Sequence, residues 1–112
     1  MKNEFSTLGV EVESGVTEIS LANARRLIKA WGKPSLIILS LKKKTQSNMI
    51  NNHTTIYWGL AKKKFICNGF GWGYGGEGPN GLVKLLRELG LKKDITDIAR
   101  IKESQLPVVF EI

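Results

Sequence analysis

The sequence has one cysteine, Cys67, and one histidine, His53, among its 112 residues. A single cysteine excludes a disulfide framework within the chain and a cluster of thiolate metal ligands, and it is typical of a reducing compartment. A Ser-His-Asp or Cys-His relay would have to run through His53, which lies in a polar stretch. We therefore expect no enzyme activity, no metal site and no cofactor.

Long apolar runs are also missing. The longest covers residues 35–41, far below the roughly 18–20 residues that a membrane-spanning helix needs. The first fifteen residues lack the charged-then-apolar order of a signal peptide. No repeat or linker divides the chain, and its length suits one hydrophobic core. We expect a soluble cytoplasmic protein with a single domain over residues 1–112 and no membrane partner.

Acidic residues are absent between residues 19 and 76, a segment that holds ten of the seventeen basic residues. The other 54 residues hold all ten acids and seven bases. Such segregation favours binding to polyanions, because each neutralised phosphate releases a counterion. The alternative is that the lysines only keep a small protein in solution. The ten bases are Arg25, Arg26, Lys29, Lys33, Lys42, Lys43, Lys44, Lys62, Lys63 and Lys64.

Hydrophobic periodicity predicts helices and strands in mixed order. A helix capped by Ser20 extends to Gly32, a second presents Leu82, Leu85, Leu86 and Leu89 and stops at Gly90, and Asp94 caps a third. Strands are expected at 35–41, 54–60, 62–70 and 107–112, the middle two as a hairpin, with a short strand or extended arm at 5–13 and a polar loop at 45–53. We expect an α+β fold: a small, mostly antiparallel sheet of 4–5 strands with two to three helices packed on one face.

Residues 70–81, FGWGYGGEGPNG, contain six glycines. They match G-x-G-x-x-G, so a phosphate cradle at the start of the following helix is one interpretation. Bulky Trp72 and Tyr74, the carboxylate of Glu77 and the lack of a ribose-binding acid downstream argue against it. The other interpretation is a tight turn, with Pro79 in the first turn of the helix.

Aromatic residues lie on the hairpin and in the glycine segment. Alternation would place Phe70, Trp72 and Tyr74 on one side, near Trp58 and the hairpin lysines. Buried, these rings would belong to the core. Exposed beside the lysines, they would form a platform on which bases stack, each contributing roughly 1–3 kcal/mol.

Residues 70–90 also resemble a family of small uncharacterised proteins, a domain of unknown function. Its pattern is Phe-x-Trp-Gly-Tyr-Gly-Gly-x-Gly-Pro, then two variable residues, a leucine and an aliphatic helix. Phe70, Trp72, Gly73, Tyr74, Gly75, Gly76, Gly78, Pro79 and Leu82 match it, and Tyr57, Trp58 and Gly59 correspond to its first strand. The likeness covers residues 57–90 and implies a shared hairpin–turn–helix unit, with no activity attached.

Two functions of different classes follow. The first is a small basic protein that binds RNA or single-stranded DNA. The second is an interaction module or inhibitor, from a virus or mobile element, that docks on an acidic protein through the same surface. A nucleotide binder using the glycine segment is a third. The predicted nucleic-acid-binding residues are Arg25, Arg26, Lys29, Lys42, Lys43, Lys44, Trp58, Lys62, Lys63, Lys64, Trp72 and Tyr74.

Overall fold

The computed structural model describes residues 6–8, 16–43 and 50–112, with the backbone alone given for 6–8, 42–43 and 50–51. Its strands are β1 (Ser6–Leu8), β2 (Leu36–Lys43), β3 (Ile50–Trp58), β4 (Lys63–Cys67) and β5 (Val108–Glu111). Its helices are α1 (Thr17–Trp31), α2 (Glu77–Glu88), α3 (Ile95–Ala99) and the 3₁₀ turn η2 (Glu103–Gln105).

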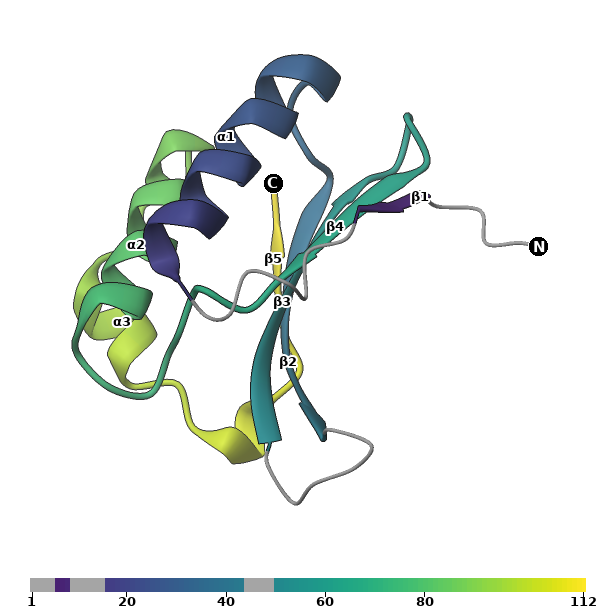
Figure 1. Cartoon of the computed structure of the whole chain (residues 1–112). Helices are drawn as coiled ribbons and strands as arrows, with labels where there is room; N and C mark the ends of the chain where they lie inside the picture. Colours follow the sequence, from purple (N-terminus) through teal and green to yellow (C-terminus); the bar gives the residue numbers. More distant parts are fainter. Residues whose placement is uncertain (1–5, 9–15, 44–49) are drawn as a thin grey trace.

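The strands form one five-stranded sheet in the order β1-β4-β3-β2-β5. The last four are antiparallel to their neighbours, and only β1 pairs in parallel, along β4. All three α-helices lie on one side of this sheet (Figure 1). The predicted α+β class, the mostly antiparallel sheet and the helices on a single face are therefore confirmed.

The core lies between this sheet and the helices. Ile37, Ile56 and Phe65 pair in register across β2, β3 and β4, and all three are buried. The helices supply Leu27 from α1 and Leu85 from α2, with further leucines one turn away. Apolar residues recur every 3.6 residues in these helices and every two residues in the strands. These two periods determine which side chains point into the layer between sheet and helices.

Helix α1 begins three residues before the predicted cap. Its N-cap is Val16, and Ser20 is buried inside the helix. The Ser20 hydroxyl accepts a hydrogen bond from the Gly69 amide at 3.1 Å, and the Thr17 hydroxyl donates to the Gly69 carbonyl at 2.6 Å. This contact with the chain leaving β4 holds the first turn, so the expectation of Ser20 as the cap was wrong.

Most other boundaries follow local chemistry. Gly32 ends α1 with a φ of +86°, which favours glycine. Asp94 caps α3 by accepting from the amides of Thr96 and Asp97, and Asp97 accepts from the Asp94 amide in return. The polar loop predicted at 45–53 was wrong over its second half, because β3 begins at Ile50 and pairs with β2 from Ile50 to Tyr57. Residues 44–49 lie outside the described part of the chain.

Candidate nucleic-acid interface

The glycine segment is a packing contact in this structure. A Cβ added to Gly69 would lie 2.5 Å from the Val16 carbonyl oxygen and closer still to the Ser20 hydroxyl. One added to Gly81 would overlap the Thr17 methyl group. Gly69 therefore lets the first turn of α1 pack directly on the chain that leaves β4, and Gly81 lets the same turn pack on α2. Close helix packing accounts for these two glycines without a ligand.

Tyr74 occupies the place where the phosphate cradle would be. Its ring packs over Gly71, Gly76 and Gly78, where added Cβ atoms would come within 2.6, 3.2 and 3.0 Å of ring or hydroxyl atoms. The amide of Gly73 donates to the Ile98 carbonyl at 3.0 Å. With its glycines covered by a phenol and this amide paired, the segment is a turn built around Tyr74.

The expected stacking platform is contradicted at two of its three rings. Trp58 is 2% exposed and Trp72 is 7% exposed, so neither ring can stack on a base. Trp58 points toward the helices because it shares its strand face with buried Ile56. Tyr74 is 52% exposed. Phe70 is buried like Trp72 while Tyr74 is exposed, so the prediction that alternation places these three rings on one side was wrong.

Tyr74 also lies far from the hairpin lysines. The chain leaving β4 packs against the first turn of α1, through the hydrogen bonds of Gly69 with Thr17 and Ser20. The hairpin turn lies at the other end of α1 (Figure 1). A helix of 15 residues is about 22 Å long at 1.5 Å per residue. The lysines and Tyr74 therefore do not form one surface.

The end of α1 and the β3–β4 turn meet at the pole of the molecule away from the glycine segment (Figure 1). The indole nitrogen of Trp58 donates to the Gly32 carbonyl at 2.7 Å. The Gly59 amide donates to the Ser35 hydroxyl at 2.9 Å, and the Ser35 amide donates to the Tyr57 carbonyl at 2.7 Å. These bonds fix the hairpin turn to the link between α1 and β2.

Four lysines belong to the three segments that are joined at this junction. Lys29 lies in the last turn of α1, Lys33 follows the helix, and Lys62 and Lys63 leave the hairpin turn. Lys29, Lys33 and Lys62 are exposed, and Lys63 is half-buried. We call the surface formed by Lys29, Lys33, Lys62 and Lys63 the basic pole. Glu111, which pairs in register with Leu36, is an acid that the sheet brings to the same end.

An aromatic pair lies under the basic pole. The rings of Trp31 and Trp58 meet edge to face, with centroids 5.0 Å apart and an interplanar angle of 84°. The ammonium of Lys63 lies 5.0 Å from the centroid of the Trp31 ring, within the range of a cation–π contact. Trp31 is half-buried, so the aromatic ring beside the hairpin lysines comes from α1 and not from the glycine segment.

The two arginines predicted to bind nucleic acid, Arg25 and Arg26, lie on α1 outside the basic pole. Arg25 faces α2 and forms an ion pair with Glu88, donating from Nε at 3.0 and 3.2 Å and from a terminal amino group. This hydrogen bonding lowers the pKa of Glu88 and raises that of Arg25. Arg26 is exposed on α1 and donates to Asn23 at 3.4 Å. Arg25 is thus neutralised by a structural partner.

Four predicted lysines remain, and the structure describes the side chain of one of them, Lys64. Lys64 alternates with Lys63 along β4 and so points to the opposite face of the sheet. Lys44 lies outside the described residues, and so do the side chains of Lys42 and Lys43.

Helix direction explains part of the charge segregation. Gly81 packs on Thr17 and Glu88 pairs with Arg25, so α1 and α2 run parallel, with their C-terminal ends toward the basic pole. Lys29 and Arg87 lie in the last turns, and Glu18 and Glu77 lie in the first turns. These placements complement the helix dipoles. The cations beyond the helix ends, Lys33, Lys62 and Lys63 among them, have no such role.

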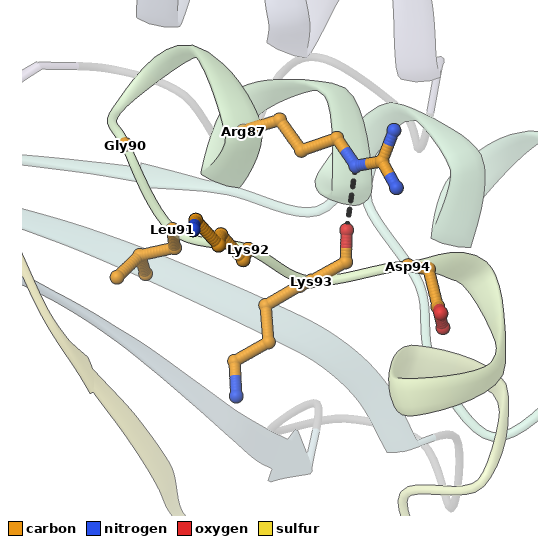
Figure 2. Close-up of a pocket in the computed structure, with 6 residues that line it drawn as sticks. All are labelled: Arg87, Gly90, Leu91, Lys92, Lys93 and Asp94. Carbon is orange, nitrogen blue, oxygen red and sulfur yellow. Dashed lines mark hydrogen bonds between the residues drawn. The ribbon is translucent and has the colours of Figure 1, made fainter.

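A shallow pocket of about 340 Å³ lies where the chain leaves α2. Arg87, Gly90, Leu91, Lys92, Lys93 and Asp94 line it (Figure 2). The Arg87 Nε donates to the Lys93 carbonyl at 2.7 Å, while Lys93 extends its ammonium to within 5.9 Å of the Phe110 ring. The Asp94 carboxylate accepts hydrogen bonds from the amides of Thr96 and Asp97 at the start of α3. With three cations and this one hydrogen-bonded acid, the lining has an electrostatic potential that favours anions.

Sequence reasoning missed Trp31 and Lys33 as members of the site. Trp31 lies on the apolar face of α1, partly buried against the core. Lys33 was counted among the bases but not among the contacts. The signal that could have found them is the short link of Gly32 to Ser35 between helix and strand, which brings the end of α1 beside the strand that pairs with the hairpin.

No protein-family model, curated protein or solved structure matches this chain. The resemblance of residues 57–90 to a domain of unknown function therefore stays a prediction. Across residues 6–8, 16–43 and 50–112, no helix has the length and apolar character needed to cross a membrane. In the same part of the chain, no three His, Cys, Asp or Glu side chains gather as metal ligands would.

Proposed function

We propose that this protein binds nucleic acid through the phosphate backbone, with the basic pole as the contact surface. The observation that carries this proposal is that the three segments bearing Lys29, Lys33, Lys62 and Lys63 are joined at one end of the molecule, where the Lys63 ammonium lies on the Trp31 ring. Three separate segments supply them, and the chain has no acidic residue between residues 19 and 76. Lysine ammonium groups that neutralise phosphates release counterions, which provides the binding free energy.

The composition of this surface favours a phosphate ligand over an acidic protein. Five large apolar side chains are markedly exposed in the described part of the chain, and of these only Leu60 lies at the hairpin turn. A protein interface normally has an apolar, aromatic-rich centre. Phosphate binding requires no such centre. Docking on an acidic protein is the alternative outcome of the test below.

Burial of Trp58 and Trp72 changes the expected mode of binding. Within the basic pole, base stacking would then depend on Trp31, and the Lys63 ammonium lies 5.0 Å from the centroid of that ring. Contacts to phosphate carry no direct sequence information. We therefore expect an affinity that depends weakly on base sequence and strongly on salt concentration. Single strands and duplexes are compared directly in the test.

The test is fluorescence anisotropy with labelled single-stranded RNA, single-stranded DNA and duplex DNA at 50 and 200 mM salt. Four phosphate contacts give a slope of about −3 in log affinity against log salt for a single strand, or roughly a 50-fold loss between these concentrations. Replacing Lys62 and Lys63 by glutamate should weaken binding at 50 mM salt by at least about tenfold and lower the slope.

The matched control is R100E/K102E, which changes the net charge equally. Arg100 and Lys102 lie near η2, before β5, at the opposite end of the sheet from the hairpin turn (Figure 1). Equal weakening by both double variants would show a response to net charge only and would contradict a localised site. Absence of binding at 50 mM salt would reject the proposal. Capture of an acidic protein after nuclease treatment, lost in K62E/K63E, would favour the alternative.

A further inference from the structure

The sheet has a second face that the helices do not cover. Side chains on β2 alternate between buried Ile37 and Leu39, which face the helices, and half-exposed Leu36 and Ile38, which face away. Val109 on β5 lies beside Ile38 and is 49% exposed. Antiparallel sheets with one solvated face usually carry polar side chains there. The apolar residues on both faces of β2 depart from this pattern.

Strand register arranges this face in rows. One row crosses β4, β3, β2 and β5 as Lys64, Tyr57, Leu36 and Glu111. The next row crosses the same strands as Ile66, Thr55, Ile38 and Val109. Each row therefore has an apolar residue at its centre or edge, and the first has a cation on β4 and an anion on β5.

The rows of one copy are complementary to the same rows of a second copy that faces it. A two-fold axis parallel to the strands and between β2 and β3 would place β4 of one copy over β5 of the other. Lys64 would then face Glu111 of the second copy, and the reverse contact would form at the other edge. The same operation sets Ile66 against Val109 and Tyr57 against Leu36. Each charge then meets its opposite, and four apolar side chains meet in pairs, while Ile38 lies opposite Thr55.

We propose that this face is a self-association surface, and that its occupant is a second copy of the chain. β2, β3, β4 and β5 are 8, 9, 5 and 4 residues long, and at about 3.4 Å per residue and 4.8 Å per strand they offer roughly 420 Å² per copy. Two copies would bury about 850 Å², an area typical of weak, transient association. Face-to-face sheets of this kind pack about 10 Å apart with interdigitating side chains.

The first measurement is sedimentation equilibrium of the full chain without nucleic acid, from micromolar to millimolar protein. We expect a monomer–dimer equilibrium. K64E and E111K should each weaken dimerisation roughly ten- to hundred-fold, because each substitution creates two like-charge pairs across the axis. K84E, the same charge change on the helix side of the molecule, should leave the dimer unchanged.

The decisive measurement mixes the two single variants. Every contact across the axis in a K64E–E111K heterodimer joins a glutamate to a lysine, so equimolar mixing should restore association that neither variant shows alone. The double variant K64E/E111K should dimerise like the original chain. Circular dichroism of each variant checks that it is folded.

Three results would overturn the proposal: a monomer at millimolar concentration, no recovery on mixing, or a dimer equally sensitive to K84E. A monomer would mean that something other than a second copy covers this face. The outcome is independent of the proposed function, because no nucleic acid is present and Lys62 and Lys63 are unchanged.

Discussion

Replacement of Gly69 by alanine tests directly whether the glycine segment is a packing contact. The added methyl group would lie 2.5 Å from the Val16 carbonyl oxygen, an atom that cannot move without shifting the start of α1. Overpacking a tight contact costs about 1–3 kcal/mol. The shift would also weaken the hydrogen bonds of Gly69 with Thr17 and Ser20, each contributing about 1 kcal/mol.

We therefore expect Gly69→Ala to lower the free energy of unfolding by about 2–4 kcal/mol. For a domain of this size that corresponds to a fall in Tm of roughly 8–16 °C. The matched control is Gly75→Ala, in the same segment, where an added Cβ meets nothing within 4 Å. That change should leave stability unaltered or raise it by about 0.5 kcal/mol, through the entropy of the unfolded chain.

The assay is urea and thermal unfolding followed by circular dichroism, on both variants and the original chain. Equal stability of the two alanine variants would refute the packing explanation. A nucleotide that raises the Tm of the original chain but not of Gly75→Ala would point instead to a ligand at the turn.

Two further predictions concern electrostatics and capping. The pKa of Glu88 is lowered by its hydrogen bonds from Arg25, so the ion pair stabilises the fold above the ordinary carboxyl pKa of 4.5 and its contribution is lost as pH falls through the lowered value. Because both side chains are about half exposed, E88Q should cost only about 0.5 kcal/mol at pH 7. The difference in unfolding free energy between E88Q and the original chain should shrink in urea titrations as the pH falls below 4.5; a difference independent of pH would contradict this. Asp94→Ala should cost about 1 kcal/mol, because the amides of Thr96 and Asp97 lose their acceptor, and asparagine at the same position should recover most of the loss; an alanine variant as stable as the original chain would count against the cap.

Local sequence chemistry was enough to predict most of the fold. Gly32 and Gly90 stop helices because a positive φ costs glycine little, and the Asp94 cap depends on residues only two and three positions away. The start of α1 could not be predicted in this way. It depends on hydrogen bonds with Gly69, which is 52 residues from Thr17 in the sequence.

The candidate site was predicted only in part. Strand alternation correctly placed Lys62 and Lys63 at the exit of a hairpin, but alternation does not say which face of a strand the helices will cover. Trp58 faces the helices and is buried. Beyond Cys67 the strand has ended, so its period of two could not be extended to Trp72 and Tyr74. Trp31 and Lys33 entered the site because α1 ends beside the hairpin.

The sequence by itself determined the order of helices and strands, the acid-free segment between residues 19 and 76, and the residues that end or cap most helices, because each of these depends on neighbours a few positions apart. The tertiary structure alone decided which lysines share a surface, which tryptophans are buried and which face of the sheet is left apolar and open. Those outcomes depend on the parallel packing of α1 with α2 and on the docking of the hairpin against Ser35 and Gly32. Contacts of that kind join residues tens of positions apart, beyond the reach of any local pattern.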